Sequence, residues 1–301
     1  MDWQKIIVEV SDPENFSFRE CLYFLGRSDK ECLHYIRGNT LQKMILAGDT
    51  PALLHIADTG KGALEVMVRA ADNTPVDAAG IRDYVSRWLD LGMNLQAFYN
   101  YSEGDTLLRG LPQRYKGLRL VGIPDLFEAI TWTIIGQQIN LAFAYTLRQR
   151  FIQAFGHHEK IDGTDYYLYP HPAVVAALPP EALLPMQFSR GKAAYIINTA
   201  QQMASGQLSA AMFATLPYEA AKEKLLALKG IGNWSANYVL MKYKRFPQAL
   251  PLEDAGLHNA IRHRLQLDAK PTPAQLQTYT GRWQQHAAYA TFYLWRSLLS
   301  Q

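Results

Sequence analysis

The first third of the chain alternates apolar and polar positions with the period of β-strands. Leu64, Val66 and Val68 alternate with Glu65, Met67 and Arg69, which predicts a strand with one buried face. Residues 5–10 are rich in β-branched side chains, and residues 34–44 are interrupted by a Gly-Asn pair, as in a strand–turn–strand unit. Residues 52–57 and 63–70 flank an Asp-Thr-Gly-Lys-Gly segment that is typical of a hairpin turn. Residues 1 to about 72 are therefore expected to be mostly β.

The apolar period changes from two to about 3.6 after residue 76. Ile81, Val85, Trp88 and Leu89 fall on one face of a helix. Beyond about residue 120 nearly all segments have a helical pattern, separated by glycine and proline residues. The pattern predicts an α+β protein: an N-terminal antiparallel sheet with helices over residues 1–112, then an all-α body over residues 113–301.

Composition adds few constraints. The chain has 301 residues, 49% of them hydrophobic, enough for a substantial core. Cys21 and Cys32 fit free thiols in a reducing cytosol, and a bridge between them is an alternative without support in the sequence. Two cysteines cannot hold a four-cysteine iron–sulfur cluster. No apolar run approaches 18 residues and the N-terminus lacks a signal-peptide pattern, so we expect a cytoplasmic protein with no membrane contact.

A turn that contains two glycines, followed by a helix, is the first candidate for a functional site. Residues 228–232 read Leu-Lys-Gly-Ile-Gly and precede a helix expected over 233–243. The two glycines permit positive φ and close approach, and the amides of a helix N-terminus favour a phosphate. Taken alone, the pentapeptide fits an ordinary turn equally well.

Basic residues are concentrated around this turn. Between positions 220 and 265 there are eight Lys or Arg residues and three acidic residues, whereas the whole chain has a net charge of only +3. Such an excess suits a surface that contacts a nucleic-acid backbone, although a solvated helix face would also explain part of it. The basic residues are Lys222, Lys224, Lys229, Lys242, Lys244, Arg245, Arg262 and Arg264.

Glu253 and Asp254 form a single acidic pair after the turn, in an otherwise apolar and basic neighbourhood, which suits chemistry on a sugar-phosphate chain. A carboxylate stabilises an oxocarbenium-like deoxyribose or orients an attacking water. The alternative is that Asp254 only caps a helix beginning near Gly256, and without further information the capping role is favoured. Glu253 is the neighbouring rival carboxylate.

These motifs together resemble the HhH-GPD superfamily of DNA base-excision glycosylases. The segment LKGIGNWSANY followed by LPLED resembles its helix-hairpin-helix and catalytic-aspartate signature, with the hairpin at 226–233. The likeness is closest to the bacterial alkylbase glycosylases of the AlkA type (3-methyladenine DNA glycosylase II). Residues 125–139, 188–196 and 283–295 extend it over roughly 115–300, and it is weaker in the N-terminal third. In that family the cleft lies between two helical lobes.

The resemblance implies roles for particular residues. Asp254 corresponds to the catalytic aspartate, and Trp234, Tyr238 and Trp295 correspond to a pocket that stacks a flipped, positively charged base. Without the resemblance these aromatic residues would be assigned to the core, where we still place Trp88, Trp132 and Trp283. Gln138 corresponds to the side chain that fills the gap left by the flipped base, although relatives carry an aliphatic residue there. In the alternative, Gln137 or Gln138 only caps a helix end.

The resemblance also implies how the hairpin binds DNA. Lys229, Gly230 and Gly232 are expected at the DNA backbone, and the carbonyls of Leu226, Leu228 and Ile231 are possible ligands of Na⁺ or K⁺. No other cofactor is expected, and no His/Cys/Asp cluster has the spacing of a zinc site.

The implied function is excision of alkylated purines from double-stranded DNA. 3-Methyladenine, 7-methylguanine and, as an extension, hypoxanthine would be released by base flipping and hydrolysis in base-excision repair. Relatives that also cut the strand use a lysine where this chain has Trp234, so we expect no lyase activity. The enzyme is expected to be a monomer in the bacterial cytosol, associated with the nucleoid. The alternatives are a non-catalytic helix-hairpin-helix DNA-binding protein and a glycosylase for another lesion, such as oxidised guanine.

Overall fold

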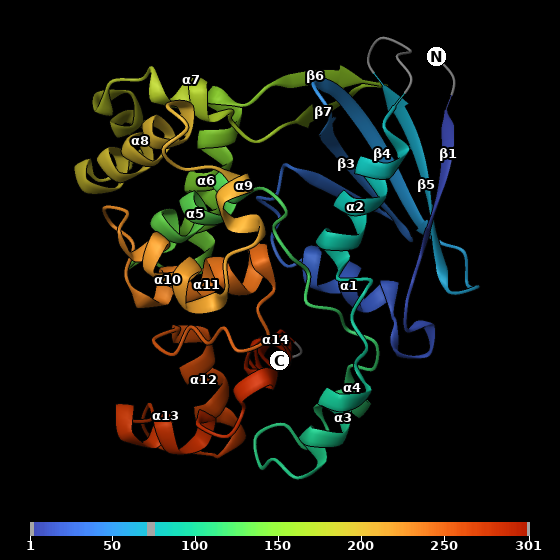
Figure 1. The fold of residues 1–301 in the computed structure, drawn as a ribbon, viewed down its shortest axis with the longest axis vertical. Coiled ribbons are helices and arrows are strands. Elements are labelled where there is room, and N and C mark those ends of the chain that lie inside the picture. The colour runs from blue at the N-terminus through green and yellow to red at the C-terminus, as the bar shows by residue number, and fades with distance from the viewer. Residues whose placement is uncertain (1–2, 71–75, 300–301) are drawn as a thin grey trace.

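The computed structural model describes residues 3–70 and 76–299, and its N-terminal part is a five-stranded antiparallel sheet (Figure 1). The strands follow one another in the order β1-β5-β4-β3-β2. They are β1 (Gln4–Glu9), β2 (His34–Arg37), β3 (Thr40–Ala47), β4 (Thr50–Asp58) and β5 (Ala63–Ala70). All five predicted strands are confirmed, and residues 71–72 of the predicted β region lie outside the described residues.

The alternation predicted for β5 is also confirmed. Leu64, Val66 and Val68 are at most 1% exposed, because this strand lies inside the sheet with its apolar face on the core. The expectation that the first 72 residues are mostly β misses helix α1 (Phe18–Leu25). Ser17 caps this helix by accepting from the amide of Glu20, and Phe18, Cys21, Leu22 and Leu25 share its buried face.

The rest of the chain is largely helical, as predicted. Short 3₁₀ turns occupy Pro13–Asn15, Pro180–Met186 and Gln284–His286, and a π-helical turn occupies Leu240–Lys244. The helices after the sheet are α2 (Ala78–Leu89), α3 (Gln96–Glu103), α4 (Leu111–Arg114), α5 (Leu126–Gly136), α6 (Leu141–Phe155), α7 (Pro172–Ala176), α8 (Arg190–Ala204), α9 (Ala210–Ala214), α10 (Tyr218–Leu226), α11 (Asn233–Val239), α12 (Ala255–Arg264), α13 (Pro273–Thr280) and α14 (Ala287–Leu298).

A second, two-stranded sheet interrupts the helical body. Strands β6 (His158–Ile161) and β7 (Thr164–Tyr167) form a hairpin that reaches the main sheet (Figure 1). The hydroxyl of Tyr166 donates to the side-chain oxygen of Gln42, and that of Tyr35 donates to the carbonyl of Asp165. An all-helical body was expected here, so this hairpin corrects the prediction. Only four residues per strand alternate, too few for a clear sequence signal.

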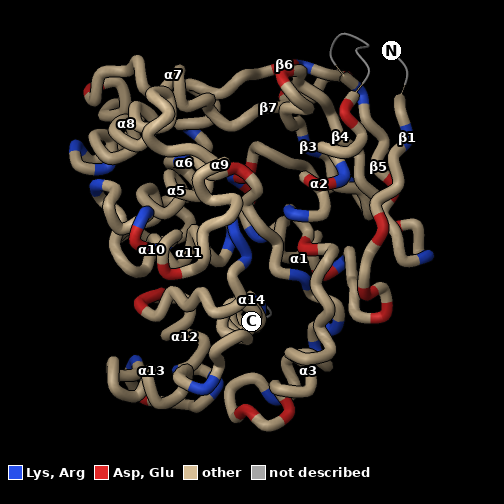
Figure 2. The backbone as a smooth tube through the Cα atoms, in the orientation of Figure 1, with Lys and Arg blue, Asp and Glu red and all other residues tan. Residues whose placement is uncertain are grey.

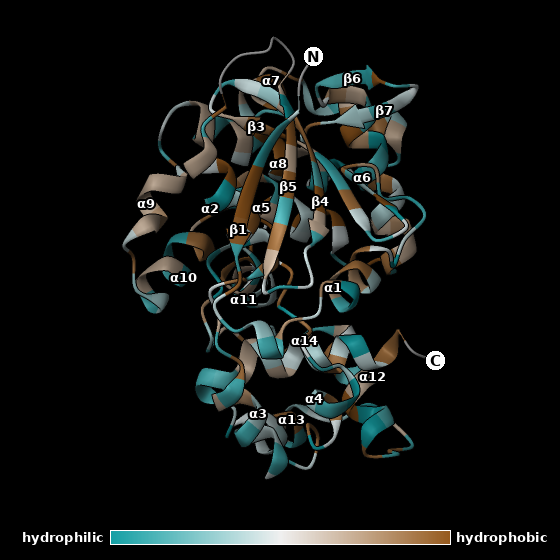
Figure 3. Ribbon diagram, turned by 90° about the vertical axis from the view of Figure 1, so that its right-hand side faces the viewer, coloured by the Kyte–Doolittle hydropathy of each residue, from teal (hydrophilic) through white to brown (hydrophobic). Residues whose placement is uncertain are grey.

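The helices form two groups (Figure 3). One runs from α5 to α11, and the other contains α12, α13 and α14 together with α3 and α4. Side chains of the α3–α4 segment join the second group: the hydroxyls of Tyr99 and Tyr293 are 3.2 Å apart, and the indole of Trp283 donates to Asp105. The chain passes from the first group to the second between residues 245 and 254, where the candidate site lies.

Candidate active site

The carboxylate of Asp254 is the centre of the candidate site. Its Oδ1 accepts hydrogen bonds from the indole nitrogen of Trp295 at 2.8 Å and from the amide of Leu257 at 2.7 Å. Its Oδ2 accepts one from the indole nitrogen of Trp234 at 3.1 Å. Three donors therefore fix the carboxylate, and Oδ2 keeps an acceptor position for a water molecule or a substrate.

Three elements bring these groups together. Asp254 is the N-cap of α12, so the capping role considered from the sequence is real and coexists with the two tryptophan contacts. Trp234 lies in the first turn of α11 and Trp295 near the end of α14. Neighbouring Glu253 is exposed, whereas Asp254 is half-buried. The geometry thus separates the two adjacent carboxylates and places only Asp254 among the aromatic residues.

Gly256 is a residue of this site that sequence reasoning missed. A Cβ atom at this position would lie 2.9 Å from Oδ1 of Asp254 and 3.2 Å from the ring of Trp295. Glycine is needed because the carboxylate and the indole both approach this backbone closely. Its position two residues after Asp254 is the only signal in the sequence.

Tyr238 joins the two tryptophans into one aromatic cluster. Its ring centroid is 5.8 Å from those of both Trp234 and Trp295. Burial raises the pKa of the Tyr238 hydroxyl, and nearby Asp254 raises it further, so the hydroxyl stays protonated. Trp234, Tyr238 and Trp295, the three residues expected to form a base pocket, lie together, and both tryptophans contact Asp254. Their contact with a base stays a prediction.

Trp132 contributes to the same cluster, although it was assigned only to the core. Trp88, Trp132 and Trp283 are indeed buried. The indole nitrogen of Trp132, however, donates to the Tyr238 hydroxyl at 2.9 Å. Nothing in the sequence links these two residues, because they are 106 positions apart.

The helix-hairpin-helix consists of α10, the turn at 227–232 and α11. Gly230 has a φ of +85°, and a Cβ there would lie 2.3 Å from the ring of Tyr195 in α8, so glycine is required. Gly232 has an extended φ of −102°, so of the two glycines only Gly230 adopts the positive φ that both permit. In the described part of the chain the amides of Gly230 and Gly232 donate to no protein acceptor, as a phosphate site requires.

The turn after α5 lies against this hairpin. The side-chain amide of Gln137 donates to the carbonyl of Gly230 at 2.8 Å and to the Ser235 hydroxyl at 3.3 Å. Gln138, with a φ of +56°, is exposed. Gln137 is the C-cap residue of α5, so one glutamine ends the helix and fixes the turn while its neighbour is free for contact. The anchoring role of Gln137 was not predicted.

The basic residues around the hairpin differ in their exposure and in their ion pairing. Lys224, Lys229 and Arg262 are exposed, but Lys242 is 3% exposed and donates to the carbonyl of Val121. Arg245 lies 3.5 Å from Asp90 and so is partly neutralised. The local excess of charge is therefore only partly a surface property, and Lys and Arg positions are spread over both helical groups and the sheet (Figure 2).

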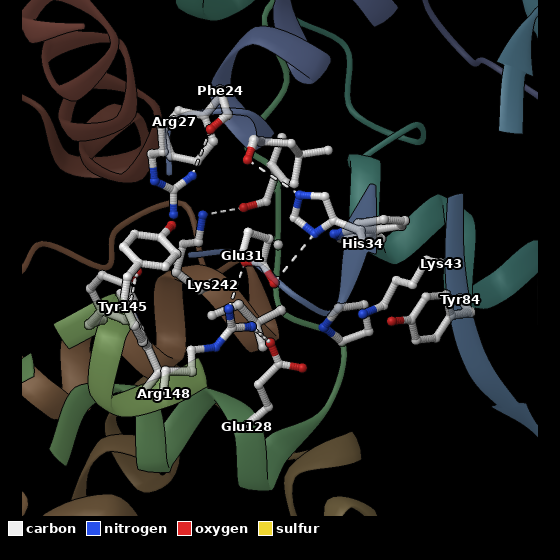
Figure 4. A pocket seen from close by; sticks show the side chains of 18 residues that line it. Phe24, Arg27, Glu31, His34, Lys43, Tyr84, Glu128, Tyr145, Arg148 and Lys242 are labelled. Carbon is white, nitrogen blue, oxygen red and sulfur yellow. Dashed lines mark hydrogen bonds and ion pairs between the residues drawn. The ribbon is translucent and has the colours of Figure 1, made fainter. Parts of the chain in front are cut away.

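A charged cavity of about 50 Å³ lies between the sheet subdomain and the helices (Figure 4). Arg148 bridges two carboxylates, Glu31 from the first subdomain and Glu128 from α5, both at 2.6 Å. Burial would raise the pKa of Glu31, but Arg148 and the other groups around it hold that pKa well below its usual range. The cavity wall includes Tyr238 and Trp132 but not Asp254.

Among residues 3–70 and 76–299, no three His, Cys, Asp or Glu side chains are grouped so as to hold a metal ion. No helix in the same ranges is long and apolar enough to cross a bilayer. Cys21 and Cys32 are buried and free, as predicted, and burial raises the pKa of each thiol to about 12.

The fold and this site define a helix-hairpin-helix protein with an aspartate at the junction of two helical groups. Residues 131–285 match the HhH-GPD superfamily of base excision DNA repair proteins, and the chain belongs to this family. It is 36% identical to the DNA-3-methyladenine glycosylase of Bacillus subtilis, over 99% of this chain and 100% of that protein. It is 31% identical to DNA-3-methyladenine glycosylase 2 of Escherichia coli, over 60% of each chain.

Solved structures share the fold across nearly the whole chain. The 3-methyladenine DNA glycosylase from Archaeoglobus fulgidus matches with a TM-score of 0.82 and 21% identity, over 96% of each chain. The 8-oxoguanine glycosylase/lyase of Clostridium acetobutylicum, in complex with double-stranded DNA, matches with a TM-score of 0.74 and 16% identity, over 99% of this chain and 98% of that chain. The predicted α+β architecture is therefore confirmed, including its N-terminal sheet.

Proposed function

We propose that this chain is a monofunctional DNA glycosylase that excises alkylated purines, such as 3-methyladenine and 7-methylguanine, from double-stranded DNA. The observation that carries the proposal is the Asp254 carboxylate, oriented by the indole N–H groups of Trp234 and Trp295. The two relatives above, both DNA-3-methyladenine glycosylases, support the lesion class at identities of 36% and 31%.

The proposed reaction begins with extrusion of the damaged nucleotide. Gln138 enters the gap in the duplex, and the amides of Gly230 and Gly232 with Lys229 contact the backbone. The rings of Trp234, Tyr238 and Trp295 hold the cationic base by stacking and cation–π attraction. Asp254 then stabilises positive charge on the deoxyribose, or directs water to it from Oδ2, while the base leaves without needing a proton.

Strand cleavage is excluded from the proposal because Trp234 occupies the position of the nucleophilic lysine in bifunctional relatives.

A monovalent cation would be held by backbone carbonyls. Leu226 ends α10, so its carbonyl is among those without an intrahelical partner, and Leu228 and Ile231 follow in the turn. Such a cation would link the hairpin to a DNA phosphate.

We further propose that the enzyme is a cytosolic monomer, which light scattering and fractionation would test.

Base release from methylated duplex DNA tests the proposal directly. We expect wild-type protein to release methylated purines and to nick DNA only after alkaline treatment. Asp254→Asn should slow release about 10²- to 10³-fold, the usual cost of losing one electrostatic stabiliser. Its fold should persist, because asparagine caps helices nearly as well as aspartate.

The matched control is Glu253→Gln, which removes the same charge from the adjacent exposed position and should leave the rate unchanged. Equal rates for wild type and Asp254→Asn would remove the catalytic assignment. DNA binding without base release would favour the non-catalytic alternative, and a covalent adduct trapped with borohydride would show a lyase instead.

A further inference from the structure

Two side chains hold the turn that carries Gln138. The amine of Lys192 in α8 donates to the carbonyl of Ile135 at 2.7 Å, at the end of α5 where the turn begins. The side-chain amide of Gln137 donates to the carbonyl of Gly230 at 2.8 Å. Helix α5 itself packs against both α8 and α11 (Figure 1). The turn is therefore attached both to the first turn of α8 and to the hairpin.

The backbone of Gln138 has a conformation that depends on such attachments. Its φ is +56°, in the left-handed region that a glutamine rarely adopts, and the residue is exposed. An exposed residue keeps this conformation only when the contacts around it determine the backbone. The hydrogen bonds at Ile135 and Gln137 lie directly before Gln138 in the chain and supply those contacts. They therefore determine where the Gln138 side chain projects.

Lys192 stabilises the end of α5 rather than its own helix. It lies in the first turn of α8, where the helix dipole disfavours a cation. The Ile135 carbonyl, by contrast, is at the C-terminal end of α5, where carbonyls lack intrahelical partners and a cation is favourable. Burial lowers the pKa of the Lys192 amine, because protein replaces part of its water shell. The favourable electrostatic interaction of this half-buried lysine is thus directed at the turn after α5.

We propose that Lys192 is a positioning residue for base flipping, which holds the turn at 136–139 so that Gln138 enters the gap in the duplex from an already ordered backbone. This inference rests on the proposed function and names a further residue on which its flipping step depends. Binding is stronger when the bound conformation is present beforehand, because no segment has to be ordered. Without the Lys192 amine the extruded nucleotide is less populated, whereas the chemical step at Asp254 is unchanged.

The base opposite the lesion determines how strongly the release rate depends on Gln138. A paired lesion is extruded for only a small fraction of the time, so its release rate is proportional to the population of the extruded state. A lesion opposite an abasic-site analogue has no base pair to break and is extruded most of the time, so weaker support from Gln138 changes its rate little. The ratio of the two rates therefore separates base flipping from chemistry and from folding.

The test measures release of a single 7-methylguanine placed opposite cytosine or opposite a tetrahydrofuran abasic-site analogue, with enzyme in excess over DNA. Lys192→Met keeps most of the side-chain length but removes the amine. It should slow release opposite cytosine about 10-fold and release opposite the analogue less than about 2-fold, as expected for the loss of one hydrogen bond from a charged donor. Lys192→Arg keeps a donor and should restore most of the wild-type ratio. Gln137→Ala removes the other attachment and should change the ratio in the same direction as Lys192→Met.

Lys244→Met is the matched control. The Lys244 amine also donates to a backbone carbonyl at a helix end, that of Ala214 at 3.0 Å. Any effect of this variant on DNA binding should slow both reactions equally and leave the ratio at the wild-type value. A double-mutant cycle tests whether Lys192 acts through Gln138. In a Gln138→Ala background, Lys192→Met should change the ratio no further.

Each outcome decides the inference separately from the proposed function. Unchanged rates in Lys192→Met, or equal slowing of both reactions, would overturn the inference, because the lysine would then act on neither step or on folding and chemistry alike. A further change of the ratio by Lys192→Met in the absence of the Gln138 side chain would also overturn it. Absence of release from either duplex by wild type, with no methylated purine released from alkylated DNA, would instead refute the proposed function.

Discussion

Replacing Arg148 by methionine should weaken the whole structure, because Arg148 joins the sheet subdomain to the helical body. Its guanidinium lies 2.6 Å from the carboxylates of both Glu31 and Glu128. The side chains of all three residues are 10% exposed or less. Methionine keeps most of the volume of arginine but leaves two buried carboxylates without a counter-charge.

The loss of unfolding free energy in Arg148→Met comes from the burial of the remaining carboxylates, and not only from the lost attraction between the guanidinium and the carboxylates. Removing one partner of a buried ion pair costs about 3–5 kcal/mol, since the remaining charge is left uncompensated. With an unfolding entropy of about 2.1 cal/mol/K per residue, this corresponds to a fall in Tm of about 5–8 °C for the 301-residue chain.

The pH dependence of this loss provides a second signature. In wild type the pKa of Glu31 is held low, so its contribution is present above the unfolded pKa and is lost on acidification. Without Arg148, burial dominates and should raise this pKa above the unfolded value. The variant then regains stability as pH falls, because protonation removes the buried charge. The difference in unfolding free energy between wild type and Arg148→Met should therefore be smaller at pH 5 than at pH 8.

Urea unfolding at the two pH values measures both effects. Arg150→Met is the matched control, because Arg150 lies on the same helix but bonds the Met186 carbonyl and the Gln187 side chain rather than a carboxylate. We expect it to cost less than about 1 kcal/mol. A loss below about 1 kcal/mol in Arg148→Met, or a loss that does not depend on pH, would refute the reasoning.

Two further predictions concern the hairpin and a buried histidine. Gly230→Ala should destabilise the protein by more than about 1 kcal/mol and weaken DNA binding, because position 230 has a positive φ and an added Cβ clashes with Tyr195. The control is Gly232→Ala, whose added Cβ meets no atom within 4 Å. Equal Tm values and equal DNA affinities of the two variants in gel-shift assays would contradict this. Burial lowers the pKa of His34 to about 4, although Glu31 opposes the shift, so its stabilising contribution is present above pH 6.5 and is lost as pH falls toward 4. Between pH 8 and pH 5 the unfolding free energy of wild type should fall by about 2 kcal/mol more than that of His34→Gln. The control His157→Gln, at an exposed position, should show the same pH dependence as wild type.

Local patterns in the sequence were sufficient to predict the five strands of the main sheet and the helical pattern after residue 76. Alternation identified β5, the Asp-Thr-Gly-Lys-Gly segment identified its hairpin with β4, and helical spacing identified α2, because these signals depend on residues a few positions apart. The family motif directed attention to Asp254 rather than Glu253. Helix α1 and the β6-β7 hairpin were missed because each is short and is stabilised by packing on distant elements.

What the sequence by itself determined was therefore the α+β class, the N-terminal sheet followed by helices, and the residue types at the candidate site. Only the tertiary structure decided which side chains meet: Trp295 with Asp254 across 41 positions, Trp132 with Tyr238 across 106, and Arg148 with Glu31 across 117. It also decided that Lys242 is buried rather than exposed. The physical reason is that hydrogen bonds and burial depend on distances in space, which the spacing of residues along a chain does not fix.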